Sequence, residues 1–343
     1  MHSREPRRET RMTTDEHRER WMKSGGVHVR GSAASQDPTL RMSSVFLRVH
    51  LWPSSLKGGA LLLALLLCVA PAAAAERIIS LAPSITETLF ALGLGDRVVG
   101  VSTYCDYPPA AAKIDRVGTF LQPNVERILT KKPDLLIAVP SPGNRGSVER
   151  LRDLGVTVLI VDPERVAQIL DSIRRIADAA GVPDKGAELV ARIEADLAAV
   201  EAKLRDAPRP RALMLVGRTP FVAAGPPTYQ GELLERAHAT NLVTGDDAWP
   251  RLSLEFIVAQ QPEVIIDASM GSEAMADRHA ALAFWQAFPT IPAVRDGRIG
   301  GQGASELLRP GPRVAETLAT VARFIHPERF ESEEKSGTTD EHR

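Results

Sequence analysis

Hydrophobic positions along residues 76–182 follow two alternating periods, which predict strands and helices in turn. Short apolar runs typical of buried strands lie at 77–82, 97–101, 134–139 and 156–161. Stretches with apolar residues three or four positions apart separate these runs and predict helices, the last of which ends near Ala180. This alternation is typical of an α/β lobe with a mostly parallel sheet.

A longer amphipathic pattern follows the first lobe. Between residues 184 and 205 the apolar positions are Leu189, Val190, Ile193, Leu197, Val200 and Leu204. Their spacing predicts one helix of about 22 residues, roughly 33 Å long. The Pro-rich segment DAPRPR (206–211) ends it. Because a helix is stiffer than a loop, we expect the parts that it joins to open and close only slightly.

A second alternation begins at Arg211 and predicts another lobe. Strand patterns lie at 211–217, 263–267 and 298–301, and helical patterns lie at 229–238, 254–260, 273–288 and 312–324. The predicted fold class is α/β, with two Rossmann-like lobes of mostly parallel sheets joined by one long backbone helix. The expected boundaries are an N-terminal lobe at 76–182, a bridging helix at 183–206, a C-terminal lobe at 207–327 and a polar tail at 328–343.

One phrase of the first lobe returns in the second. PNVERILTKKPDLLIAV (123–139) aligns without a gap with LSLEFIVAQQPEVIIDA (252–268). Asn124 and Ser253 are good N-caps, because their side-chain oxygens accept an otherwise unpaired backbone N–H. A proline ends each predicted helix, and an apolar strand follows. The unit is therefore helix, turn and strand, which indicates two lobes of similar build.

The first 75 residues differ from the rest. Residues 1–41 are polar without an apolar period, which is typical of disorder. A cation at Lys57, an apolar stretch at 61–70 and a run of small residues ending at Ala75 then follow. The apolar stretch is shorter than the ~20 residues that a membrane helix needs. It predicts a secretory signal peptide cut after about Ala75 and hence a periplasmic protein.

Two residues of this leader bear on how the chain is processed. Because a signal peptide normally begins near the N-terminus, Met42 is a candidate start. Cys68 is a candidate for lipid anchoring, but a lipidated cysteine usually follows a small residue, and Leu67 stands there. We therefore expect a secreted chain without a lipid anchor.

Composition and motifs argue against several classes of function. The net charge is -1, without the basic surplus that nucleic-acid binding needs. The histidines after Ala75 are His238, His279, His326 and His342, and no two have metal-ligand spacing. No GxGxxG follows a strand, and no Walker lysine follows a Gly-rich loop. We expect a monomer with no metal or cofactor of its own.

A secreted α/β enzyme is the alternative from another class. Its nucleophile would be Cys105 or Ser84. Cys105 has no histidine nearby in sequence to activate it, and we expect it to be a small residue of the cleft wall. Ser84 with Glu87 fits a helix capping box, S-x-x-E. A binding protein is therefore the favoured interpretation.

Aromatic residues gather in the loops after the predicted strands, although they make up only 5% of the chain. Open α/β sheets bind ligands beyond the carboxyl ends of their strands. The loop residues of interest are Tyr104, Tyr107, Phe120, Phe221, Trp249 and Arg309. Flat side chains and one cation suit a large, flat, partly anionic or amide-bearing ligand. Alternatively, Tyr107 packs in a turn, Phe221 belongs to the core and Arg309 caps a helix.

Several long stretches resemble one family. They are RIISLAPSITETLFALGLGDRVVGVSTYCDYPP, NVERILTKKPDLLIA, the bridging helix and GPRVAETLATVARFIHPE. Together they resemble the helical-backbone (class III) solute-binding proteins of iron-complex and cobalamin ABC importers, over about 77–327. The resemblance implies a periplasmic receptor without catalytic activity, which captures its ligand between two lobes and delivers it to a permease dimer.

The resemblance to the cobalamin-binding members also implies site residues. The implied ligand contacts are Tyr104, Phe120, Phe221, Trp249, Arg309 and Ser305. Phe120 replaces a tryptophan and keeps a stacking surface, whereas Ser305 replaces an acid that helps to hold the ligand. The expected ligand is cobalamin or a related corrinoid. Haem or a ferric siderophore remains the alternative, with Tyr104 able to serve as an iron ligand.

In this family one surface glutamate on each lobe is understood to meet arginines of the permease, and the matching residues are Glu126 and Glu255. The alternative is that an acid in a first helical turn only complements the helix dipole, worth ~0.3 to 1 kcal/mol. That alternative explains either glutamate alone. It does not explain their equivalent placement, which a two-fold symmetric partner would require.

Overall fold

The structure is a computed structural model that describes residues 74–268, 278–301 and 304–330. The predicted leader, almost all of the predicted signal peptide and most of the polar tail lie outside the described residues. Within the described ranges, no helix is both long and apolar enough to cross a membrane.

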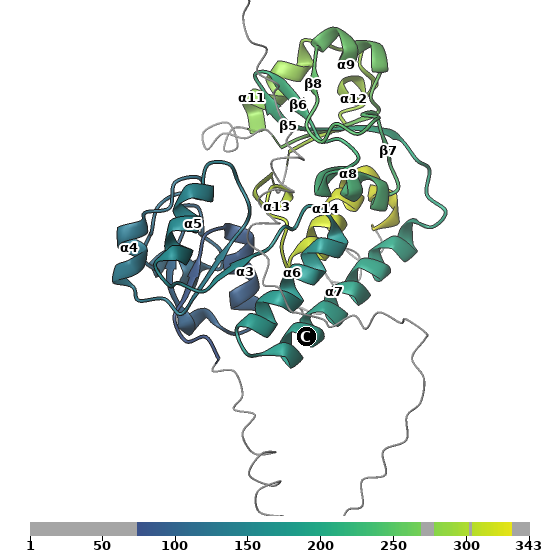
Figure 1. Cartoon of the computed structure of the whole chain (residues 1–343). Coiled ribbons are helices and arrows are strands. Elements are labelled where there is room, and N and C mark those ends of the chain that lie inside the picture. The colour runs from purple at the N-terminus through teal and green to yellow at the C-terminus, as the bar shows by residue number, and fades with distance from the viewer. Residues whose placement is uncertain (1–73, 269–277, 302–303, 331–343) are drawn as a thin grey trace, which may run out of the picture. The chain divides into compact units, whose positions relative to one another are not determined.

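The first lobe carries the labels α3, α4 and α5 in Figure 1. It is built on a parallel sheet with strand order β2-β1-β3-β4. The strands are β1 (Ile78–Ser80), β2 (Val98–Val101), β3 (Leu135–Ala138) and β4 (Val158–Ile160). The helices are α3 (Pro83–Ala91), α4 (Val125–Thr130), α5 (Arg145–Asp153) and α6 (Val166–Ala179), with short 3-10 turns at Gly95–Arg97 and Pro109–Lys113. Central strands β1 and β3 are buried along their whole length, as their unbroken apolar runs require.

The second lobe has a mixed sheet in the described residues, with strand order β10-β9-β5-β6-β8 and β7 beside β5. The strands are β5 (Arg211–Arg218), β6 (Phe221–Ala223), β7 (Thr240–Asn241), β8 (Arg251–Leu252), β9 (Val264–Asp267) and β10 (Ile299–Gly300). The helices are α8 (Tyr229–Arg236), α9 (Leu254–Gln260), α11 (Arg278–Gln286), α12 (Pro292–Arg295), α13 (Ala304–Leu307) and α14 (Val314–Ile325), with a 3-10 turn at Pro327–Arg329. The α/β fold class is confirmed, but β6 and β8 add antiparallel pairs that the sequence pattern did not predict.

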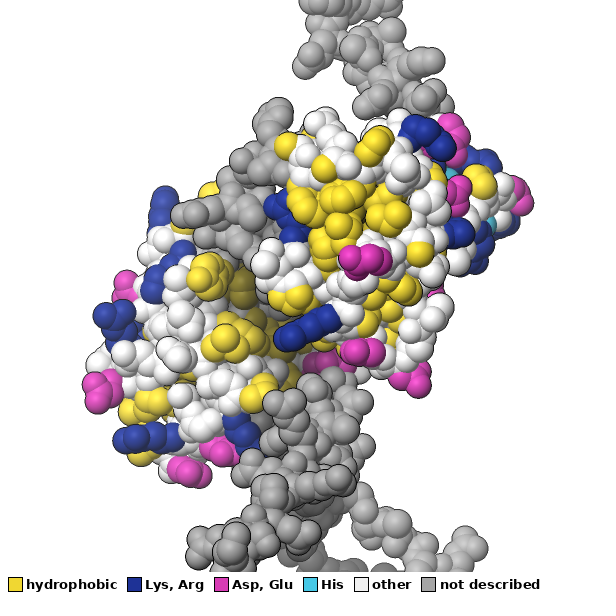
Figure 2. All heavy atoms as spheres, turned by 90° about the horizontal axis from the view of Figure 1, so that it is seen from above, with side chains coloured by type: hydrophobic (Ala, Val, Ile, Leu, Met, Phe, Trp, Pro, Cys, Tyr) yellow, Lys and Arg dark blue, Asp and Glu magenta, His cyan; other side chains and the backbone are white. Residues whose placement is uncertain are grey.

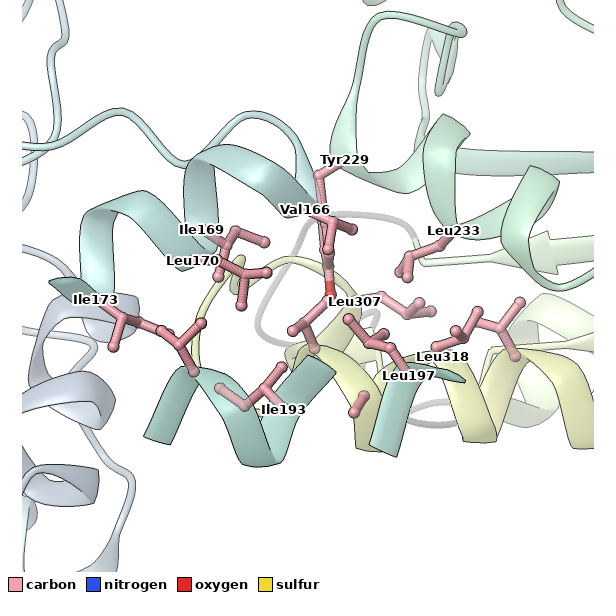
Figure 3. Packing of buried hydrophobic residues seen from close by; sticks show 14 of the residues in the cluster. Val166, Ile169, Leu170, Ile173, Ile193, Leu197, Tyr229, Leu233, Leu307 and Leu318 are labelled. Atoms are coloured by element: carbon pink, nitrogen blue, oxygen red, sulfur yellow. The ribbon is translucent and has the colours of Figure 1, made fainter. Parts of the chain in front are cut away.

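Helix α7 (Pro183–Leu204) runs between the lobes and packs against α6 of the first lobe and α14 of the second. Figure 3 shows Ile193 and Leu197 of α7 among apolar side chains of the neighbouring helices, including Ile169 and Leu318. All four are buried and belong to one hydrophobic cluster. The core is therefore continuous from one lobe to the other.

The repeated phrase folds in the same way in both lobes. Asn124 begins α4 and Ser253 begins α9, and each side-chain oxygen accepts the backbone N–H three residues further on, at 2.9 and 3.1 Å. The residue before each proline, Lys132 or Gln261, takes a left-handed conformation with φ of 47° or 50°. These matching caps and turns confirm the predicted unit.

The acid after each proline anchors the first strand of its lobe. The Asp134 carboxylate accepts the backbone N–H of Arg77 at 3.0 Å, and that of Glu263 accepts the backbone N–H of Arg211 at 2.9 Å. The backbone N–H of each acid donates in return to the carbonyl of the same arginine. One part of the repeat is therefore structural, because it sets where each sheet begins.

The predicted capping box at the start of α3 is wrong. The N-cap of this helix is Ala82, which makes no side-chain capping hydrogen bond, and Pro83 occupies the first turn. Ser84 is buried, and the Glu87 carboxylate binds Arg313 of the second lobe instead. The S-x-x-E spacing therefore does not mark a capping box here, because Glu87 pairs with the charged Arg313 instead.

Candidate functional site

The loop after β2 carries two exposed aromatic side chains on a buried anchor. Cys105 is 1% exposed, and its Sγ lies 3.1 Å from the Ser102 hydroxyl. Tyr104 on one side of it is 63% exposed, and Tyr107 is also exposed. The expectation that Cys105 lines a cleft wall is wrong, since the thiol lies in the hydrophobic core. Burial also raises the pKa of the Cys105 thiol, which disfavours the reactive thiolate.

Phe120 lies in a tight turn next to this loop. The turn closes through a bridge between Gly118 and Pro123, and the backbone N–H of Thr103 donates to the Gly118 carbonyl at 3.0 Å. Gly118 has a φ of 111°, and a Cβ there would lie 2.6 Å from the Gln122 carbonyl, so the turn requires glycine. The Phe120 ring is partly buried against the core. The structure therefore brings Tyr104 and Phe120 to neighbouring loops of the first lobe.

Arg309 reaches from the segment between α13 and α14 to the loop of the first lobe. Its guanidinium makes a two-pronged ion pair with Asp106, with Nη1–Oδ1 at 2.5 Å and Nη2–Oδ2 at 3.1 Å. Nη1 also lies 3.6 Å from Glu87 Oε1. Arg309 holds the pKa of the Asp106 carboxyl below its usual value through this hydrogen bond and its charge. The predicted cation therefore binds the loop that carries Tyr104, but it already has a carboxylate partner in Asp106.

A second arginine strengthens the same inter-lobe contact. Arg313 donates from Nε and Nη2 to the Glu87 carboxylate at 2.8 and 2.9 Å, and from Nη1 to Glu306 at 3.3 Å. Its guanidinium also lies over the Tyr107 ring, 4.0 Å from the centroid. Tyr107 therefore packs against a cation. Sequence reasoning did not find Asp106 or Arg313 as site residues, since no local pattern pairs positions about two hundred residues apart.

Phe221 belongs to an aromatic cluster of the second lobe. Its ring centroid lies 5.8 Å from that of Phe284 and 5.9 Å from that of Trp285. Trp285 is fully buried, and its Nε1 donates to the Asp267 carboxylate at 3.1 Å. Arg218, at the end of β5, lies 3.5 Å from the same carboxylate. Phe221 is only partly buried, so the structure leaves part of its ring accessible on this cluster.

Trp249 and Ser305 complete the predicted ligand contacts. Trp249 precedes β8 and is 45% exposed, and its backbone N–H donates to Asp247 Oδ1 at 3.0 Å. Ser305 lies in α13, but its side chain is outside the described residues. On the face of the molecule drawn in Figure 2, hydrophobic side chains gather in patches. Exposed aromatic rings are therefore available on both lobes, while the ligand contacts stay a prediction.

The two candidate docking glutamates occupy equivalent places. Glu126 and Glu255 each lie in the first turn of their helix, α4 or α9, and both are exposed. The pKa of Glu255 is lowered by hydrogen bonds from its own backbone N–H and from the Ser253 hydroxyl. Both glutamates are therefore accessible to a partner from solvent.

Two α/β lobes joined by one long helix, with aromatic loops at the strand ends, define a two-lobed binding protein. The sequence pattern of the family described as "Periplasmic binding protein" matches residues 78–301, and the chain belongs to this family. It is 31% identical to an uncharacterised ABC transporter substrate-binding lipoprotein of Bacillus subtilis, over 74% of this chain and 81% of the relative.

Two solved structures have the same fold. The periplasmic vitamin B12-binding protein of Vibrio cholerae is 30% identical, with a TM-score of 0.62, over 73% of this chain and 97% of the other. A periplasmic haem-binding protein in complex with two haems is also 30% identical, with a TM-score of 0.66, over 74% of this chain and 98% of the other. The similarity therefore extends to binders of two kinds of tetrapyrrole.

Proposed function

We infer that this protein is the substrate-binding component of an ABC importer and that its ligand is a corrinoid or a related tetrapyrrole. The observation that carries the inference is the ion pair between Arg309 of the second lobe and Asp106, which lies on the same first-lobe loop as the exposed Tyr104. An exposed ring on a loop that also makes an inter-lobe polar contact suits a large flat ligand with a polar rim. Membership of the periplasmic binding protein family supports the same role.

The ligand can be tested by titration. The purified protein is mixed with cobalamin, cobinamide, haemin or a ferric siderophore, and tryptophan fluorescence is followed. Trp249 is exposed and should be quenched by a tetrapyrrole, whereas Trp285 is buried against Phe221. Trp249→Phe should therefore remove most of the signal while binding persists in an equilibrium dialysis control. Tighter binding of the siderophore than of any tetrapyrrole would refute the corrinoid proposal.

Docking to a permease is the second part of the proposal. Glu126 and Glu255 stand at equivalent positions of a repeated unit, and a two-fold symmetric partner would use such a pair. Replacing both by alanine should abolish transport while ligand affinity stays unchanged. The matched control is Glu188→Ala with Glu316→Ala, which removes the same charge from exposed positions of α7 and α14. Transport by the first double variant would show that these glutamates do not dock.

Export is proposed from the leader alone. We expect cleavage after about Ala75 and no lipid on Cys68. Mass spectrometry of the protein recovered from the periplasm tests both points, because an N-terminus that carries Cys68 with an acyl group would contradict them.

An enzyme of the same fold would need an accessible nucleophile. Both candidates are buried: Ser84 is nearly inaccessible, and the pKa of Cys105 is raised by burial. These environments favour a receptor over a hydrolase. Cys105→Ala and Ser84→Ala should therefore change affinity at most, whereas loss of a measurable turnover would support the enzyme.

A further inference from the structure

Five charged residues form one inter-lobe group, here called the arginine cluster: Glu87, Asp106, Glu306, Arg309 and Arg313. Each guanidinium binds at least one carboxylate within it. Because three carboxylates face two guanidiniums, these groups together carry one net negative charge when all are ionised. A ligand that reaches Arg309 therefore does not meet an unpaired cation.

Asp106 is the member of the cluster that faces outward. The side chain of Arg309 is 15% exposed, whereas that of Asp106 is 63% exposed. Its neighbours fix its place, since Cys105 is buried and Tyr107 lies against the Arg313 guanidinium. The Cys105 carbonyl also accepts a hydrogen bond from Arg116 at 2.8 Å. Because both of its sequence neighbours are anchored, Asp106 is held in position to pair with Arg309.

This arrangement treats two kinds of ligand rim differently. A carboxylate that approaches Arg309 must either displace Asp106 or add a second negative charge beside Asp106 and Glu87, and both routes are unfavourable. An amide can accept from the guanidinium and donate to the Asp106 carboxylate, and it leaves the pair intact. The structure therefore favours an amide rim over a carboxylate rim.

We propose that Asp106 is a specificity-determining residue, which selects tetrapyrroles with amide-bearing rims against those with carboxylates by occupying Arg309. The proposal rests on the proposed function, because it names the ligand class of the same site. Of the two ligand types expected from the sequence, partly anionic or amide-bearing, the proposal selects the amide-bearing ligand.

The test compares two probes on the full mature chain. Haemin carries propionate carboxylates, and dicyanocobinamide carries amides. In Asp106→Asn, haemin binding should strengthen about tenfold relative to dicyanocobinamide binding, which corresponds to about 1.4 kcal/mol. The change should be larger at low salt. The control is Asp115→Asn, which removes a similar charge from an exposed pair with Lys131 on the same lobe and should leave the ratio of the two dissociation constants within about twofold.

The outcomes separate the role of Asp106 from the proposal that the protein is a tetrapyrrole receptor. If the wild-type protein binds at least one probe and Asp106→Asn does not improve haemin binding relative to dicyanocobinamide binding, Asp106 has no role in selection and the receptor proposal stands. If the wild-type protein binds neither probe, the tetrapyrrole proposal fails and the role of Asp106 fails with it. Circular dichroism of both variants checks that a changed ratio does not come from misfolding.

Discussion

Glu87 provides the sharpest test of the inter-lobe contact. Its side chain is only 2% exposed, and both of its oxygens accept hydrogen bonds from Arg313, at 2.8 and 2.9 Å. In Glu87→Gln the charge disappears and an amide N–H₂ faces a guanidinium N–H. The Arg313 guanidinium then loses its main counter-ion, and breaking a fully buried pair in this way costs about 3–5 kcal/mol.

The expected cost here lies below that range. Arg313 is partly exposed and keeps Glu306 at 3.3 Å and the Tyr107 ring at 4.0 Å. We therefore expect Glu87→Gln to lower the free energy of unfolding by about 2–3 kcal/mol. At about 2–4 °C per kcal/mol for a chain of this size, Tm should fall by roughly 5–10 °C.

Urea and thermal unfolding of the ligand-free protein measure this loss. Glu306→Gln is the control, because its side chain is 39% exposed and should cost less than about 1 kcal/mol. The double variant Glu87→Gln with Arg313→Met should be less destabilised than the sum of its single variants, since neither charge is left alone. A Glu87→Gln variant within about 0.5 kcal/mol of wild type, or an additive double variant, would refute the reasoning.

Three further predictions follow from local environments. Gly186→Ala should destabilise the protein by about 1–3 kcal/mol, because the new Cβ would lie 2.4 Å from the Cβ of Ala177. Gly146→Ala places its Cβ in open space and should not destabilise the protein. Thermal melts of the two variants measure the difference. The Cys105 thiol should resist Ellman's reagent until urea unfolds the protein, since burial raises its pKa, and rapid reaction in the native state would contradict its burial. The pKa of Asp106 is lowered in the fold, so its stabilising contribution is present above its ordinary value near 3.8 and is lost as the pH falls through the lower folded value. The Tm difference between wild type and Asp106→Asn should therefore shrink at low pH, and a constant difference would show that the ion pair contributes nothing.

The elements with a long or repeated pattern could be predicted from the sequence. The long helix α7 shows itself through apolar residues at helical spacing, and the repeat shows itself through Asn124 and Ser253 before matching apolar runs. Strands β6 and β8 were missed because three and two residues are too few to show a period. The pattern also predicted helix where 273–277 lie outside the described residues.

The candidate site was predictable only in part. Loop position after a strand was enough to single out Tyr104 and Arg309, and the structure pairs Arg309 with Asp106 on the loop that carries Tyr104. The pairs Arg309–Asp106 and Arg313–Glu87 could not be found, because an ion pair between residues more than two hundred positions apart leaves no local pattern. Glu87 shows the reverse error, since its spacing from Ser84 matched a local motif while its partner lay in the other lobe.

The continuous core has a consequence for attempts to dissect the protein. Helix α6 places Ile169 and Ile173 in the same buried cluster as Ile193 of α7, and α14 of the second lobe closes the same cluster. A fragment that ended at Ala180 would expose those side chains to water and would be prone to aggregate. The lobes can be told apart by their sheets, but neither is expected to survive expression as a separate piece.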